Sequence, residues 1–160
     1  MSAKSKKGIM KKIIIVCIAT FMLSCSKDSP SDIEPDFIEI AKDILNGGGT
    51  EGIVKSNLVI KDISTWTSII NQMDLINKES AKFTETDIDF NRYQVIAVFD
   101  KVYGNGGYSI DITNIKENES NLIIKVENLN KGGLLSIITQ PYHIVKIKKT
   151  DKNIVFEQES

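Results

Sequence analysis

Few residues in this chain could support catalysis. The 160-residue sequence has one histidine, His143, and two cysteines, Cys17 and Cys25. A Ser-His-Asp site would have to combine His143 with a serine such as Ser109 or Ser136, but no Gly-x-Ser-x-Gly turn marks a nucleophile. A single histidine among scattered carboxylates also lacks the spacing of a metal site. We therefore expect no catalytic residue, no metal and no cofactor, and we expect His143 to be either hydrogen-bonded inside the domain or on its surface.

A glycine-rich segment is the second feature with possible chemistry. It consists of Gly104, Asn105, Gly106, Gly107 and Tyr108. Its glycines can adopt positive φ and expose backbone N–H groups. A dinucleotide fingerprint is excluded because Ser109 stands at the third glycine position, and a phosphate loop is excluded because Gly-Lys-Ser/Thr is missing. Two interpretations remain, a permissive hairpin turn and a recognition loop with Tyr108 as the residue that anchors a partner.

The N-terminal segment has the composition of an export signal. Two lysines, Lys11 and Lys12, precede a mostly apolar run over 13–23. A transmembrane helix is the alternative, but it needs roughly 20 apolar residues. The run ends in Met22-Leu23-Ser24-Cys25, which resembles a bacterial lipobox.

This pattern predicts a lipoprotein signal peptide over 1–24, with Cys25 as the lipid-attachment site and the new N-terminus. The alternative is conventional cleavage before an unmodified Cys25. The sequence offers two start positions, Met1 and Met10. The degenerate lipobox is similar to those of Bacteroidetes-type lipoproteins. We expect several acyl chains to anchor the protein stably in a bilayer, and we expect the cell envelope as its location, on the outer membrane facing the periplasm or the cell surface.

The rest of the chain is acidic. Without the five lysines of the signal, 15 basic residues face 21 acidic ones, so nucleic acid is not an expected partner. Residues 25–36 are polar, contain two prolines and predict a flexible linker after the lipidated cysteine. A single domain is expected over 37–160.

The N-terminal half of this domain predicts strands and one helix. Residues 37–45 are strand-like, with a helix as the competing prediction, and they are connected by glycines to a second strand over 52–60 as a hairpin or loose turn. A helix beginning at Ser64 or Thr65 carries an apolar stripe. The stripe consists of Trp66, Ile69, Ile70, Met73 and Ile76.

The C-terminal half predicts strands only. Residues 93–99 are almost continuously apolar, which is typical of a central strand covered on both faces. Alternating runs over 108–112 and 122–127 flank a polar turn, and further strands are expected within 136–148 and 153–157. One helix and six or seven strands in hairpin order predict an α+β domain with a mainly antiparallel sheet.

Three segments together resemble the C-terminal domain of the protease complex subunit PrcB family. They are Val95-Ile96-Ala97-Val98-Phe99, Gly104 with Gly106-Gly107-Tyr108-Ser109-Ile110, and Thr139-Gln140-Pro141-Tyr142-His143-Ile144-Val145-Lys146-Ile147. The similarity covers residues 93–148 well and 37–90 loosely, and Asn105 departs from a threonine that the family favours. The resemblance implies a non-catalytic lipoprotein that supports the assembly or stability of a cell-envelope protease.

The expected function is therefore that of a membrane-anchored subunit that binds a cell-envelope protease or another envelope protein and supports its assembly or stability. The residues expected to form the partner-binding surface are Gly104, Asn105, Gly106, Gly107, Tyr108, Gln140, Pro141, Tyr142 and His143. Strand addition at an open sheet edge is one available mode. The alternative function is a protease inhibitor similar to chagasin, with the Gly104–Tyr108 loop as the wedge.

Overall fold

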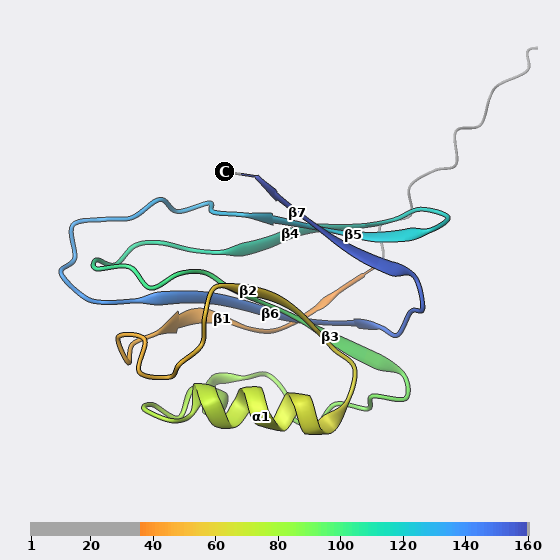
Figure 1. Ribbon diagram of the computed structural model, residues 1–160, viewed down its shortest axis with the longest axis horizontal. Coiled ribbons are helices and arrows are strands. Elements are labelled where there is room, and N and C mark those ends of the chain that lie inside the picture. The colour runs from red at the N-terminus through yellow and green to blue at the C-terminus, as the bar shows by residue number, and fades with distance from the viewer. Residues whose placement is uncertain (1–35, 160) are drawn as a thin grey trace, which may run out of the picture.

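The computed structural model describes residues 36–159. The predicted signal peptide, Cys25 and almost all of the predicted linker lie outside this range. The described chain forms three layers, which are one helix, a four-stranded sheet and a three-stranded sheet (Figure 1). This architecture confirms the α+β prediction, although the strands divide into two sheets. No helix in residues 36–159 is long and apolar enough to cross a membrane.

The four-stranded sheet is the middle layer. Its strands, in spatial order, are β1 (Ile38–Leu45), β6 (Gln140–Lys148), β3 (Tyr93–Phe99) and β2 (Ser56–Ile60). All neighbours are antiparallel. The strand prediction for 37–45 is therefore confirmed over the competing helix. The predicted hairpin between the first two strands is wrong, because β1 and β2 occupy opposite edges of the sheet and β6 and β3 lie between them.

The three-stranded sheet covers one face of the middle layer. It contains β4 (Asp111–Glu117), β5 (Asn121–Glu127) and β7 (Asn153–Glu159). The hairpin of β4 and β5 is antiparallel, whereas β5 and β7 are parallel. The first of these strands was predicted over 108–112, but it begins at Asp111 and continues into the predicted polar turn.

Two hydrophobic cores share the middle sheet. Alternate residues of β3 point to opposite faces, so Val95, Ala97 and Phe99 pack toward the helix. Ile96 and Val98 pack between the two sheets. The prediction of a central strand covered on both faces is confirmed, since both sets are fully buried.

The third layer is the helix α1 (Ile63–Met73), followed by a short 3₁₀ helix, η1 (Glu79–Lys82). Asp62 is the N-cap residue, because its Oδ1 accepts a 2.8 Å hydrogen bond from the Thr65 N–H. The predicted helix start at Ser64 or Thr65 is thus corrected by two or three residues. Trp66 is completely buried, whereas Ile76 lies beyond the helix and is half exposed.

Candidate functional site

Three long loops meet at one end of the domain. They consist of residues 46–55, 101–110 and 128–139, and we call them together the loop end (Figure 1). Each loop follows or precedes a strand of the middle sheet, so the sheet order brings distant segments together. Strand β1 begins at the opposite end of the domain. A polypeptide that reaches β1 therefore enters the domain far from the loop end.

The Asp100 carboxylate holds the base of all three loops. It accepts hydrogen bonds from the Tyr103 hydroxyl at 2.7 Å, the Asn128 amide at 2.8 Å and the Lys101 N–H at 2.9 Å. The Lys55 ammonium lies 3.0 Å from it. Burial raises the pKa of this carboxyl, but the hydrogen bonds and the Lys55 charge outweigh burial and hold the pKa below its ordinary value. Asp100 is therefore a buried anion that depends on these donors.

Backbone and side-chain contacts connect the second and third loops. The Gly106 N–H donates to the Leu135 carbonyl, and the Gly133 N–H donates to the Gly106 carbonyl, both at 2.8 Å. The Asn105 amide donates to the Gly133 carbonyl at 2.8 Å. The buried Thr139 hydroxyl in turn donates to the Asn105 carbonyl. The glycine-rich segment is thus braced along its length by the loop that follows β5.

Tyr108 is part of this bracing. Its ring stacks on Tyr103, with centroids 3.6 Å apart and planes within 8°. Its other neighbour is Gly132, where an added Cβ would lie 2.5 Å from the Tyr108 ring. Gly107 has a φ of +83°, and a Cβ there would lie 2.8 Å from the Gly133 nitrogen. Tyr108 is only half-buried, but its ring packs within the loop end, which differs from the predicted role of a free anchor for a partner.

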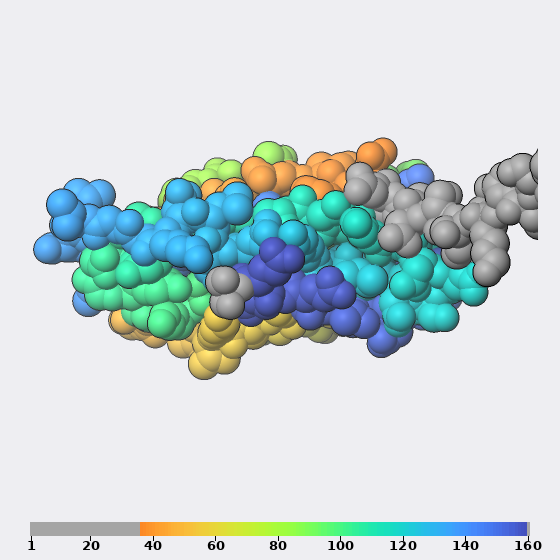
Figure 2. Space-filling view, turned by 90° about the horizontal axis from the view of Figure 1, so that it is seen from above, coloured from red at the N-terminus to blue at the C-terminus, as the bar shows by residue number. Residues whose placement is uncertain are grey.

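The outer surface of the loop end is apolar. Its exposed large aliphatic residues are Val54, Val102, Leu129, Leu134, Leu135, Ile137 and Ile138. Leu134 is fully exposed at 103%, and Leu135 is 70% exposed. The space-filling view shows residues of the third loop projecting from this end of the molecule (Figure 2). Seven exposed large aliphatic side chains in three neighbouring loops are typical of a surface that binds a partner.

The Gln140–His143 segment is not on the surface. These four residues begin strand β6 in the centre of the middle sheet, and all of them are buried. Gln140 donates from its amide to the carbonyls of Ile53 and Asp100, both at 2.8 Å, so it fastens the first loop to the end of β3. The structure corrects the expectation that this segment is presented to a partner, because both faces of the sheet are covered there.

His143 lies between the two sheets. Its Nδ1 accepts a 2.9 Å hydrogen bond from the Ile112 N–H of β4, and its Nε2 lies 3.1 Å from Glu39 Oε2 of β1. Burial lowers the pKa of His143, and the Lys42 ammonium acts in the same direction, against the Glu39 carboxylate. The prediction of an internally hydrogen-bonded histidine is confirmed. The Nδ1 contact joins the two sheets, whereas the Nε2 contact to Glu39 lies within the middle sheet, because β1 and β6 are neighbours there.

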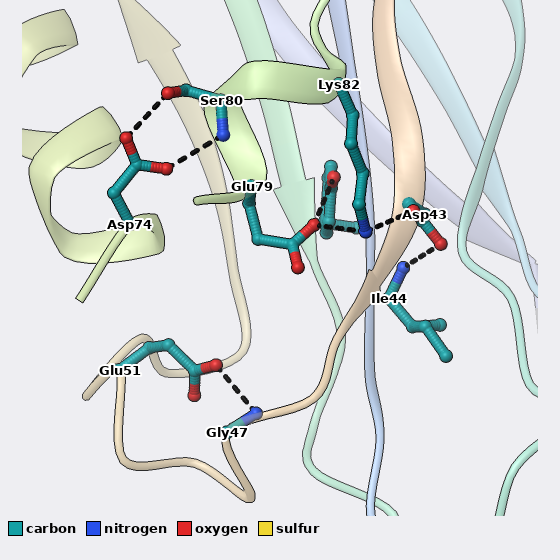
Figure 3. Close-up of polar contacts among 9 residues, drawn as sticks. Asp43, Ile44, Gly47, Glu51, Asp74, Glu79, Ser80 and Lys82 are labelled. Carbon is teal, nitrogen blue, oxygen red and sulfur yellow. Dashed lines mark hydrogen bonds and ion pairs between the residues drawn. The ribbon is translucent and has the colours of Figure 1, made fainter. Parts of the chain in front are cut away.

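A second polar cluster lies on the helix side of the middle sheet. Lys82 pairs with Glu79 at 2.8 Å and with Asp43 at 2.9 Å, and Asp74 accepts two hydrogen bonds from Ser80 (Figure 3). These contacts fasten the 3₁₀ helix to β1 and to the end of α1. In residues 36–159 no group of three or more histidine, cysteine, aspartate and glutamate side chains is placed to hold a metal ion. The role that these contacts give the cluster is to hold the 3₁₀ helix in place.

Sequence reasoning missed the residues that dominate the loop end. The run Leu134-Leu135-Ser136-Ile137-Ile138 was expected to lead into a strand of the core, since large aliphatic residues usually are buried. The one available signal was its position directly after Gly132 and Gly133, which favours a turn. No protein family, curated protein or solved structure was found to match the chain. The geometry of the loop end is therefore the main evidence for function.

Proposed function

We propose that this chain is a non-catalytic, lipid-anchored subunit of the cell envelope that binds a partner protein through the loop end and supports its assembly or stability. A protease is the partner that the resemblance to the PrcB family implies. The observation that carries the proposal is the exposed aliphatic surface of the third loop, which is supported by the contacts of Asp100, Asn105 and Tyr108 at the base of the loop end.

The framework supports binding for a physical reason. A loop that is ordered before binding loses less conformational entropy when a partner docks. The contacts of Asp100, Asn105 and Tyr108 order the loops in the absence of any partner. Exposed leucines such as Leu134 and Leu135 then contribute about 1.5–3 kcal/mol each when a partner buries them.

The proposal also accounts for the position of the anchor. If Cys25 is acylated, the membrane attachment precedes β1, which begins at the end of the domain away from the loops. The loop end would then face away from its own attachment point. This arrangement favours contact with another envelope component over contact with the anchoring lipids.

Affinity capture tests the proposal. The full-length chain is expressed with a C-terminal tag, and partners are captured from detergent-solubilised envelope. We expect one stoichiometric partner, and we expect Leu134→Ser/Leu135→Ser to reduce its recovery by at least about tenfold. The matched control is Ile38→Ser/Ile63→Ser, which changes two half-exposed aliphatic residues outside the three loops. Equal recovery with all three forms would contradict the proposed docking surface.

The bracing of the Gly104–Tyr108 loop favours the alternative function, a protease inhibitor. A wedge that enters a protease cleft must be rigid, and the Gly104–Tyr108 loop is braced by Gly133, Leu135 and the Tyr103 ring. The chain from Ser26 onward, added at micromolar concentration to a papain-like protease, tests this function. Unchanged peptidase activity removes the alternative, and inhibition that Tyr108→Ala abolishes would favour it.

A further inference from the structure

The chemistry of the loop end indicates what kind of partner segment it accepts. The following inference rests on the proposed function. It uses three properties of the third loop and its neighbours, which are unpaired backbone donors, exposed charges of one sign, and the aliphatic surface already described.

Several backbone N–H groups of the third loop have no acceptor among residues 36–159. The N–H groups of Leu134, Leu135, Ser136 and Ile138 donate no hydrogen bond to any residue in the range 36–159. Neighbouring backbone groups are paired, as shown by the 3.0 Å bond from the Ile137 N–H to the Leu135 carbonyl. The free donors are clustered on the exposed part of the loop, where a partner can supply acceptors.

The exposed charges of the loop end are all positive. Lys55, Lys101 and Lys131 are exposed, and the second and third loops contain no acidic residue. The first loop contains one, Glu51, which is 2% exposed and accepts a hydrogen bond from the Gly47 N–H. Lys55 is paired with the Asp100 carboxylate, so the positive charges left for a partner among the three described loops are Lys101 and Lys131, although the chain without its predicted signal is acidic overall. A partner with carboxylates complements both the lysines and the free N–H donors.

A protein segment fits these properties better than a lipid bilayer. The hydrocarbon region of a bilayer offers no acceptor for unpaired backbone N–H groups, and irregular loops with such groups do not enter it. An extended polypeptide supplies carbonyl acceptors along its backbone and alternating side chains to both sides. The aliphatic surface around Leu134 and Leu135 then takes its apolar side chains.

We infer that the loop end binds an extended segment of its partner protein that alternates large apolar side chains with carboxylates. The apolar side chains contact Leu134, Leu135 and Ile138. The carboxylates pair with Lys101 and Lys131, and the partner backbone accepts from the free N–H groups of the third loop.

Synthetic peptides test the inference. The probe is a fluorescent peptide of about 12 residues in which leucine and glutamate alternate, a length that spans a strand-addition site. Three further peptides carry lysine for glutamate, serine for leucine, or backbone esters in place of amides, because ester carbonyls are weaker hydrogen-bond acceptors than amide carbonyls. Binding to the chain from Ser26 onward, which contains both described cores entire, is measured by fluorescence anisotropy at low and high salt.

We expect the acidic peptide to bind and the basic, serine and ester-containing peptides to bind at least about tenfold more weakly. Leu134→Ser/Leu135→Ser and Lys101→Glu/Lys131→Glu should each weaken binding about tenfold. The matched controls, Ile38→Ser/Ile63→Ser and Lys116→Glu/Lys148→Glu, should leave it unchanged. Circular dichroism of every variant confirms that the variant is folded.

The inference is overturned if the acidic and basic peptides bind equally, or if Lys101→Glu/Lys131→Glu leaves binding of the acidic peptide unchanged. A second outcome also overturns it. In that outcome the domain sediments with vesicles of phosphatidylcholine and about 30% phosphatidylglycerol, the sedimentation requires Leu134, and the acidic peptide does not compete with the vesicles. The proposed function fails separately. If envelope capture still depends on Leu134 and Leu135 while every peptide fails, docking stands and the partner chemistry is wrong.

Discussion

Replacement of Asp100 by alanine should destabilise the domain and loosen all three loops of the loop end. The carboxylate is 1% exposed and accepts hydrogen bonds from Tyr103, Asn128 and the Lys101 N–H. Alanine leaves these donors partly buried without their acceptor. Because each donor belongs to, or lies next to, a loop that forms the proposed docking surface, stability and binding should fall together.

The magnitude follows from the individual contacts. Hydrogen bonds to a charged acceptor contribute about 1.5–3 kcal/mol each, so the bonds from Tyr103 and Asn128 together are expected to contribute about 3 kcal/mol at the lower limit. The ion pair with Lys55 adds less than about 1 kcal/mol, since the Lys55 side chain is 48% exposed. We therefore expect Asp100→Ala to lower the free energy of unfolding by about 3 kcal/mol, and Asp100→Asn by roughly half of that.

Urea unfolding at pH 7 measures this loss, and Asp151→Ala is the control, since Asp151 is exposed and its loss should be below about 0.5 kcal/mol. The pKa of Asp100 is lowered from 3.8 in the folded chain. Its contribution is therefore present above pH 3.8 and is lost as the pH falls through the folded pKa. A deficit below about 1 kcal/mol at pH 7, or one that grows as the pH falls below 4, would refute the reasoning.

Three further changes test the cores and the loops. Trp66→Ala should lower the free energy of unfolding by about 3–5 kcal/mol, because the ring is fully buried and its Nε1 donates to the Thr86 carbonyl at 2.8 Å. Chemical denaturation measures this loss, and a loss under about 1 kcal/mol would contradict the role of Trp66 as the main packing residue of the helix. Gly107→Ala should lose at least about 1–2 kcal/mol for its positive φ, whereas Gly104→Ala, whose Cβ would meet nothing within 4 Å, should melt like the parent. Burial holds the pKa of His143 below 6.5 in the folded chain, so as the pH falls the imidazole is protonated in the unfolded chain first. The free energy of unfolding should therefore fall as the pH drops below 6.5, and the His143 contribution should be fully present above that pH. His143→Gln should flatten the slope between pH 5 and 7, and an unchanged slope would exclude His143 as its source.

The elements that the sequence predicted well are those with strong local patterns. The apolar run of β3 and the stripe that contains Trp66 each require burial on a definite face, whatever their neighbours are. The described helix therefore differs from its prediction mainly at its ends. Asp62 was missed as the cap because Ser64 and Thr65 are equally suitable residue types, and only the backbone geometry decides among them.

The pairing of distant strands was not predictable in the same way. Strand β1 pairs with β6, about a hundred residues later in the chain, and no local pattern in β1 encodes that choice. The same limit affected the candidate site. Tyr142 and His143 were expected to contact a partner, but they are covered because α1 and the three-stranded sheet close over opposite faces of β6. The exposure of Leu134 was missed because composition alone assigns a leucine to the core.

The strand order also determines when the chain can fold. Among the described strands β1 pairs with β6 alone, and β6 ends at Lys148, so a growing chain that stops before Gln140 cannot complete the middle sheet. Such long-range pairing gives a high contact order and slow folding. Strand β1 would then lack its pairing strand, and remain accessible to chaperones, until β6 emerges. If the chain is exported as proposed, this delay keeps it unfolded during export, and its exposed strand edges are the corresponding aggregation hazard.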